Sequence, residues 1–94
     1  MIYDIAIIGG GAAGLSAAIY GARGGMNVVV FEDIGYGGQI NYTSEVDNYL
    51  GISSVSGAEL ADKMRAHAAK YDCTFKSESI RKIENVSQPV KKLI

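Results

Sequence analysis

The glycine-rich stretch at positions 7–25, "IIGGGAAGLSAAIYGARGG", constrains the fold of this chain more than any other feature. Gly9, Gly11 and Gly14 follow the pattern G-x-G-x-x-G within it. The pattern alone is weak, because glycine-rich turns are common, and it gains meaning only between a strand and a helix. Residues 2–8, "IYDIAII", predict that strand, since an isoleucine-rich run is typical of a buried parallel strand.

The residues behind the motif complete a strand–helix–strand unit. Alanine dominates from Gly11 to about Arg23 and predicts a helix, which the glycines at 24–25 end. Residues 27–31, "NVVVF", are apolar and β-branched, so they predict a second strand. A crossover of this kind is almost always right-handed and leaves the two strands parallel. We therefore expect the α/β class, with a Rossmann-like, mostly parallel sheet and helices.

Each glycine of the motif has a separate physical task. Gly9 permits the sharp turn out of the strand, Gly11 lets a pyrophosphate approach the backbone, and Gly14 lets the helix lie close to the strands. Ala12 and Ala13 keep the turn small. The start of the helix adds free amides and the positive end of its dipole. The alternative is a small-residue helix that only packs tightly, and the strand–helix context favours the phosphate site.

An acidic residue at the end of the second strand supports a dinucleotide. Glu32 follows Gly14 by 18 positions, where a carboxylate can accept hydrogen bonds from both ribose hydroxyls of an adenosine. Asp33 beside it is a second candidate, and the alternative for either acid is a solvated carboxylate at a strand end. A carboxylate there disfavours a 2′-phosphate, so the motif indicates FAD or NAD rather than NADP.

A long loop and a second helix follow. Residues 33–55 are rich in glycine, asparagine, tyrosine and serine, and loops of this length usually serve a site. Ser56 and Glu59 form a capping box that begins the second helix. The apolar stripe of that helix comprises Leu60, Met64, His67 and Tyr71, with Ala61 and Ala68 beside them. Residues 73–86 predict a third strand that breaks near 77–79.

The loop carries a resemblance to a known family. Residues 35–51, "GYGGQINYTSEVDNYLG", resemble the flavin-contacting segment of the low-molecular-weight thioredoxin reductases. The glycine pair at 37–38 is followed by Gln39, and Asn48 lies in the "EVDNY" part of the pattern. Leu50 replaces the proline usual in the family. The likeness spans essentially the whole chain and includes both helices.

The resemblance implies roles for individual residues. The pyrophosphate would lie against positions 10–13, and Glu32 would bind the adenosine ribose. Gln39 and Asn48 would reach the flavin, whose ring edge needs mixed donors and acceptors; the alternative for both is ordinary loop polarity. The backbone of Ile83 would contact the adenine. The cofactor-binding candidates are therefore Gly9, Gly10, Gly11, Ala12, Ala13, Gly14, Glu32, Asp33, Gly37, Gly38, Gln39, Asn48 and Ile83.

The same resemblance implies an activity and a domain plan. The family passes electrons from NADPH to FAD, then to a cysteine pair, then to thioredoxin, and we expect a cytoplasmic homodimer. Residues 1–94 would be the N-terminal part of an FAD-binding domain, without the NADPH domain, the C-x-x-C pair or the C-terminal FAD motif, and inactive alone. Two alternatives stay open: a related flavoprotein with a peroxiredoxin-linked or ferredoxin-linked reaction, or a stand-alone dinucleotide-binding module that is not catalytic.

Composition and single residues exclude other classes. The net charge of −1 over 94 residues gives no electrostatic case for nucleic acid. No apolar run is long enough for a membrane span, and no signal peptide is expected. The single cysteine, Cys73, fits a reducing compartment and a structural thiol. We expect His67 to be packed, no metal site and no catalytic residue here. The loop tyrosines, expected to pack at the surface, are Tyr36, Tyr42 and Tyr49.

Overall fold

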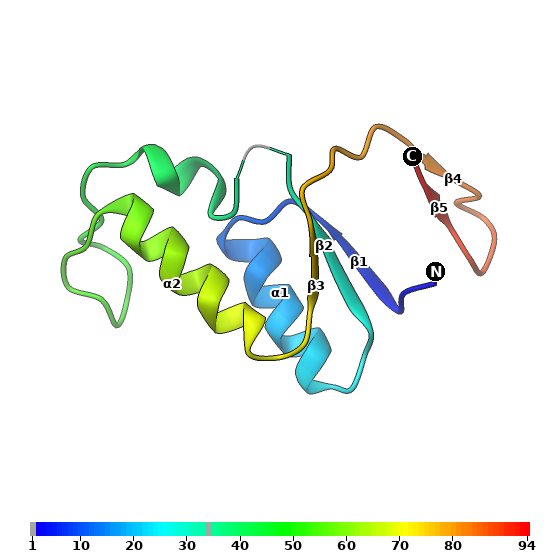
Figure 1. The fold of residues 1–94 in the computed structure, drawn as a ribbon, viewed down its shortest axis with the longest axis horizontal. Coiled ribbons are helices and arrows are strands. Elements are labelled where there is room, and N and C mark those ends of the chain that lie inside the picture. The colour runs from blue at the N-terminus through cyan, green and yellow to red at the C-terminus, as the bar shows by residue number, and fades with distance from the viewer. Residues whose placement is uncertain (1, 34) are drawn as a thin grey trace.

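The computed structural model describes residues 2–33 and 35–94 as a small layered α/β unit (Figure 1). Helices and strands alternate along the first three quarters of the chain, and two short strands end it. In order, the elements are β1 (Ile5–Ile8), α1 (Ala12–Arg23), β2 (Val28–Phe31), a short 3₁₀ helix η1 (Gly38–Tyr42), α2 (Gly57–Ala69), β3 (Thr74–Lys76), β4 (Ile83–Glu84) and β5 (Lys92–Leu93).

The first three strands form one parallel sheet in the order β1-β2-β3. Ile5 pairs with Val28, and Val29 pairs with Thr74. Residues 28–30 in the central strand are at most 1% exposed, which explains their unbroken apolar run. The expected α/β class and mostly parallel sheet are confirmed. The first strand is shorter than predicted, since it begins at Ile5. Asp4 before it bonds twice to Asn27: its amide donates to the Asn27 carbonyl oxygen at 2.9 Å, and its carboxylate accepts from the Asn27 amide at 2.7 Å.

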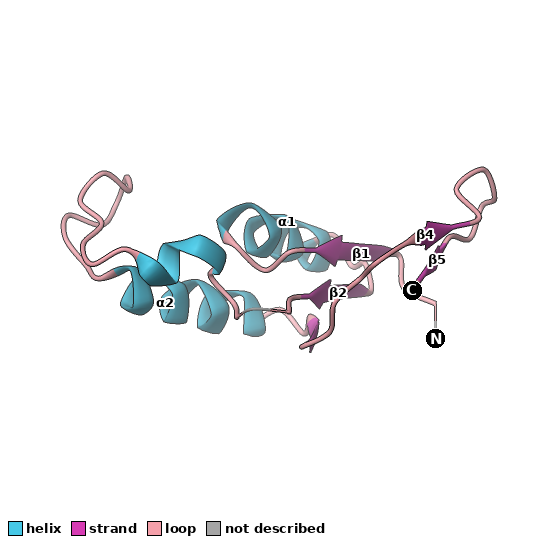
Figure 2. Cartoon of the chain, turned by 90° about the horizontal axis from the view of Figure 1, so that it is seen from above, coloured by secondary structure: helices cyan, strands magenta, loops and turns pink. Residues whose placement is uncertain are grey.

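Both long helices lie on one side of the sheet, and the two short strands lie at the opposite end of the molecule (Figures 1 and 2). Ala18 of α1 packs on Val28 and Val30 in one buried cluster. Leu60 of α2 packs on Val46 and Val55, which anchors the long loop in a second cluster. Packing of small alanines from α1 onto a valine-rich strand allows the helix and sheet to approach closely.

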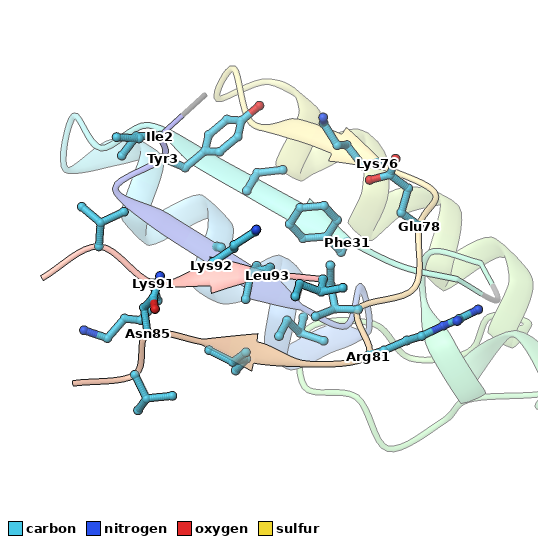
Figure 3. Close-up of a pocket in the computed structure, with 18 of the residues that line it drawn as sticks. Ile2, Tyr3, Phe31, Lys76, Glu78, Arg81, Asn85, Lys91, Lys92 and Leu93 are labelled. Carbon is cyan, nitrogen blue, oxygen red and sulfur yellow. The ribbon is translucent and has the colours of Figure 1, made fainter. Parts of the chain in front are cut away.

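The other face of the sheet borders an open groove (Figure 3). Its volume is about 1370 Å³. Ile2, Ala6 and Phe31 line one side, and Leu93 in the β4–β5 hairpin lines the other. The hairpin is antiparallel, with Ile83 paired to Leu93. The predicted third strand is therefore two strands, separated by the break expected near 77–79, and the pairing of β4 with β5 was not predicted.

The second helix begins at its predicted cap. The Ser56 hydroxyl accepts a 3.1 Å hydrogen bond from the amide of Glu59. Leu60 is 1% exposed, as the apolar stripe predicts. His67 is exposed rather than packed, which contradicts the expectation, and its ring lies 6.0 Å from the ring of Tyr71. The buried face of the helix includes Ala61 and Ala68, and His67, which precedes Ala68, lies outside it.

Replacement of Ser56 by alanine tests the cap. The variant loses the acceptor for the Glu59 amide, so we expect the free energy of unfolding to fall by about 1 kcal/mol. Urea denaturation followed by circular dichroism measures the loss. Ser16→Ala, at an exposed position within α1, is the control and should leave stability equal or slightly higher because alanine favours helices. Equal midpoints for Ser56→Ala and the unchanged chain would contradict the assignment.

Candidate functional site

The site begins where β1 turns into α1. Gly9 has φ +111°, a conformation that side-chain-bearing residues rarely adopt. Its amide donates a 2.8 Å hydrogen bond to the carbonyl oxygen of Phe31, so the turn stays attached to the end of β2. The chain therefore leaves the sheet at its carboxyl edge, which is where open α/β sheets bind ligands.

The first turn of α1 lies against the backbone it has just left. A Cβ atom at Gly14 would overlap the carbonyl oxygen of Gly9 and would lie 3.2 Å from a methyl group of Ile7. Only glycine allows this approach. Because the helix starts so close to the strand end, its N-terminus points over the carboxyl edge of the sheet.

The N-terminus of α1 presents backbone amides. Gly11 is the N-cap and makes no side-chain cap hydrogen bond, and the first helical bond runs from the Leu15 amide to the Gly11 carbonyl. The amides of residues 11–14 precede that bond, so the helical ladder leaves them unused. A Cβ at Gly11 would meet only the Gly37 carbonyl oxygen, at 3.8 Å. An anion can therefore approach these amides, and the helix dipole favours it.

The structure separates the two acids at the end of β2. One Glu32 carboxylate oxygen accepts a 2.7 Å hydrogen bond from the Gly10 amide. The Glu32 amide donates to the Lys76 carbonyl oxygen at 3.1 Å, so the acid is fixed between β2 and β3. Glu32 is half-buried beside the turn, whereas Asp33 is exposed. The geometry favours Glu32 over Asp33 as the acceptor for a ligand at the turn.

The glycine pair of the long loop packs on the same turn. The Gly37 amide donates a 2.7 Å hydrogen bond to the Gly10 carbonyl oxygen. Gly37 has φ +101°, and a Cβ there would overlap the side chain of Ala61 in α2. A Cβ at Gly38 would lie 3.5 Å from the Gly11 Cα. These two positions therefore belong to the site through their backbone.

The remaining candidates lie farther out. Gln39 follows the glycine pair within η1 and is exposed. Asn48 is exposed in the loop closed by the Val46–Val55 bridge. Ile83 lies in β4 and lines the groove below the sheet. The structure thus brings residues 9–14, Glu32 and the glycine pair together at the turn. Gln39, Asn48 and Ile83 lie outside this group.

Tyr36 is a participant that sequence reasoning missed. It was expected to pack at the surface, but its ring lies against Gly10, and its hydroxyl lies 3.1 Å from the carbonyl oxygens of both Val30 and Lys76. Burial raises the pKa of the Tyr36 hydroxyl, an effect that the nearby Arg65 partly opposes.

The comparisons with known proteins identify the family of this chain. The family model described as pyridine nucleotide-disulphide oxidoreductase matches residues 3–92. The chain belongs to that family. Membership implies a flavin cofactor, and the resemblance to thioredoxin reductases is confirmed.

Two kinds of relative illustrate the match to this family. The thioredoxin reductase of Mycolicibacterium smegmatis is 37% identical over 94 residues, which are 99% of this chain and 30% of the relative. The structure of thioredoxin reductase from Streptococcus pyogenes MGAS5005 superposes with a TM-score of 0.94 at 39% identity. The match covers 99% of this chain and 30% of that one. The chain therefore spans less than a third of the proteins it resembles.

A ferredoxin-flavin thioredoxin reductase from Clostridium acetobutylicum is also similar. It superposes with a TM-score of 0.80 at 37% identity, over 88% of this chain and 29% of that one.

Metal clusters, membrane spans and the cysteine can each be checked in the described part of the chain. Among residues 2–33 and 35–94, His, Cys, Asp and Glu side chains form no group of three or more that could hold a metal ion. Within the same ranges, no helix combines the length and apolar character needed to cross a bilayer. Cys73 lies with its sulfur 3.6 Å from the Ala18 carbonyl oxygen, and burial, followed by the charge of Asp72, raises the pKa of its thiol.

The raised pKa of Cys73 predicts a slow thiol. A higher pKa leaves less thiolate at any given pH, and the thiolate is the nucleophile. At pH 8 we expect a disulfide reagent such as 5,5′-dithiobis(2-nitrobenzoate) to react more slowly with the folded chain than with the chain in urea. Stopped-flow absorbance of the released thiolate measures both rates. Equal rates would show that the fold does not protect this sulfur.

The glycine at position 14 offers a test of the turn. Gly14→Ala introduces a methyl group that collides with the Gly9 carbonyl, and we expect a loss of about 1–3 kcal/mol in the free energy of unfolding. Alanine is intrinsically more favourable than glycine in a helix by about 1 kcal/mol, which offsets part of the cost of the collision. Ala17→Gly, at an exposed position of α1, is the matched control for propensity. A stabilised Gly14→Ala variant would contradict the close approach.

Proposed function

We propose that this chain is the FAD-binding portion of a thioredoxin reductase-like flavoprotein, which passes electrons from NADPH through FAD and a cysteine pair to the disulfide of thioredoxin or a similar protein. We further propose that residues 1–94 are the N-terminal part of its FAD-binding domain and that the whole protein is a cytoplasmic homodimer. One observation carries the proposal: the 2.7 Å hydrogen bond between the Gly10 amide and Glu32 brings a carboxylate next to the uncapped start of α1.

That juxtaposition matches the two polar parts of an adenosine diphosphate. The amides at positions 11–14 supply donors for the diphosphate, together with the helix dipole. The Glu32 carboxylate supplies acceptors for the ribose hydroxyls, and it would repel a phosphate at the 2′ position. The two parts of the ligand are covalently joined, so both protein groups have to lie at one edge of the sheet.

The flavin half of the cofactor would extend toward the long loop. Gln39 and Asn48 offer amide donors and acceptors, and their exposed side chains can reorient onto a ring. The flavin supplies the electron-transfer chemistry when it is bound. The residues of this chain bind and orient it. With one cysteine in the sequence, the redox-active pair of the proposed reaction is not among these 94 residues.

A ferredoxin-linked reaction is the second candidate. It is favoured by the likeness to the ferredoxin-flavin thioredoxin reductase of Clostridium acetobutylicum, at 37% identity. The FAD site described above would be the same in both cases, because the two candidates differ in the electron donor only.

Isothermal titration of the 94-residue chain with FAD and with ADP tests the site. We expect both to bind, and Glu32→Ala to weaken both by about 10- to 100-fold, because a hydrogen bond to a charged group is worth about 1.5–3 kcal/mol. Glu32→Gln keeps an oxygen for the Gly10 amide and should lose less. Asp33→Asn is the matched control and should bind as the unchanged chain does, since the carboxylate that accepts from the Gly10 amide at the turn is that of Glu32.

Failure of the unchanged chain to bind either ligand at millimolar concentration would overturn the proposed site. Binding of ADP without any tighter binding of FAD would support a dinucleotide module without a flavin function. A greater loss for Asp33→Asn than for Glu32→Ala would move the ribose contact to the other acid.

A further inference from the structure

The residue that most constrains Gly10 is Tyr36. An ideal Cβ built on Gly10 would lie 2.5 Å from one ring carbon of Tyr36, 2.8 Å from another and 3.2 Å from the Glu32 Cβ. Gly10 is buried. Its Cα therefore lies in a narrow space between the ring of Tyr36 and the side chain of Glu32.

Both backbone groups of Gly10 are directed by this neighbourhood. Its amide donates to Glu32 at 2.7 Å, and its carbonyl oxygen accepts from the Gly37 amide at 2.7 Å. Gly37 is the residue after Tyr36, so the same short segment contacts Gly10 through a ring and through an amide. Glycine has the greatest backbone freedom of any residue, and its orientation here depends on these contacts.

The ring of Tyr36 is itself anchored by three elements. Its hydroxyl reaches the carbonyl oxygens of Val30 in β2 and Lys76 in β3, both at 3.1 Å. Its ring meets Phe75 edge to face, with centroids 5.3 Å apart. The Arg65 guanidinium carbon from α2 lies 4.9 Å from the Tyr36 centroid and 3.5 Å from that of Phe75. Cation–π and aromatic contacts of this kind add to the stability of a ring position.

We propose that Tyr36 is a positioning residue of the dinucleotide site: by packing on Gly10 it sets the direction of the Gly10 amide, and with it the Glu32 carboxylate. The inference rests on the proposed function for its ligand, but the Tyr36–Gly10–Glu32 linkage exists in the free chain. In the proposed role Tyr36 touches neither the ribose nor the diphosphate. It acts through Gly10.

The mechanism follows from the geometry of the turn. Gly10 lies directly before Gly11, whose amide belongs to the diphosphate-binding group. The Gly10 amide belongs to the peptide before its Cα, and the Gly11 amide belongs to the peptide after it, together with the Gly10 carbonyl that accepts from Gly37. A shift of the Gly10 Cα into the space left by the ring would tilt both peptides, so it would weaken the hydrogen bond to Glu32 and redirect the Gly11 amide. Loss of the ring therefore affects both halves of an adenosine diphosphate, whereas loss of a ligand-contacting group would affect one.

Amide hydrogen exchange of the ¹⁵N-labelled 94-residue chain tests the linkage without ligand. In Tyr36→Leu we expect exchange at Gly10 to become at least about tenfold faster, while amides of β2 stay protected. Tyr36→Phe keeps the ring and should restore protection to within about threefold of the unchanged chain. Tyr20→Leu is the matched control, because Tyr20 also lies beneath an arginine, Arg23, but is 69% exposed on α1 away from the turn.

Titration with ADP gives the second readout. We expect about tenfold weaker binding for Tyr36→Leu and near-normal binding for Tyr36→Phe and Tyr20→Leu. If Tyr36→Leu does not give a dispersed spectrum, Tyr36→Met, which fills the space with a flexible apolar side chain, takes its place. In either variant, unchanged exchange at Gly10 overturns the proposal.

The two readouts keep this proposal distinct from the proposed function. Faster exchange at Gly10 with unchanged ADP affinity also overturns the positioning role. Failure of the unchanged chain to bind ADP, with exchange at Gly10 still responding to Tyr36, overturns the dinucleotide site and supports the linkage alone. Faster exchange and weaker ADP binding together support the proposal as stated.

Discussion

The site depends on the close approach of the first turn of α1 to the end of β1. That approach exists because Gly14 has no side chain to collide with the carbonyl of Gly9. With the helix start held over the carboxyl edge of the sheet, its unused amides, the Glu32 carboxylate and the glycine pair of the long loop come within contact of one short turn. A larger residue at position 14 would separate the helix from the strand and disperse the group.

Local patterns predicted the parts of the fold in which neighbouring residues determine the outcome. The strand–glycine–helix pattern predicted the parallel pairing of β1 with β2, and the Ser56–Glu59 pair predicted the start of α2. The site at the turn could be predicted for the same reason, since glycine spacing expresses a steric demand of the backbone itself. Proximity of Glu32 to that turn could also be anticipated, because both lie at the carboxyl ends of adjacent parallel strands.

Features that depend on distant partners could not be predicted. The pairing of β4 with β5 joins Ile83 to Leu93, and two-residue strands carry no periodicity to reveal it. The spacing of apolar residues puts His67 on the apolar side of α2, but the structure leaves it exposed. A small shift in helical phase decides which residues at the border of such a stripe are covered, and the sequence does not specify that shift. Tyr36 reads as an ordinary loop tyrosine until β3 and α2 bring Phe75 and Arg65 beside it.

The carbonyl oxygen of Lys76 links the assembly of the site to the order in which the chain folds. It accepts from the Glu32 amide and lies within hydrogen-bond distance of the Tyr36 hydroxyl, so the end of the third strand completes a centre whose other parts lie about forty or more positions earlier in the chain. A parallel pairing needs a long crossover connection, here α2, so its contacts are non-local, and non-local contacts form slowly. The centre should therefore mature late during folding, and any molecule captured there would draw the whole three-stranded assembly toward its native state.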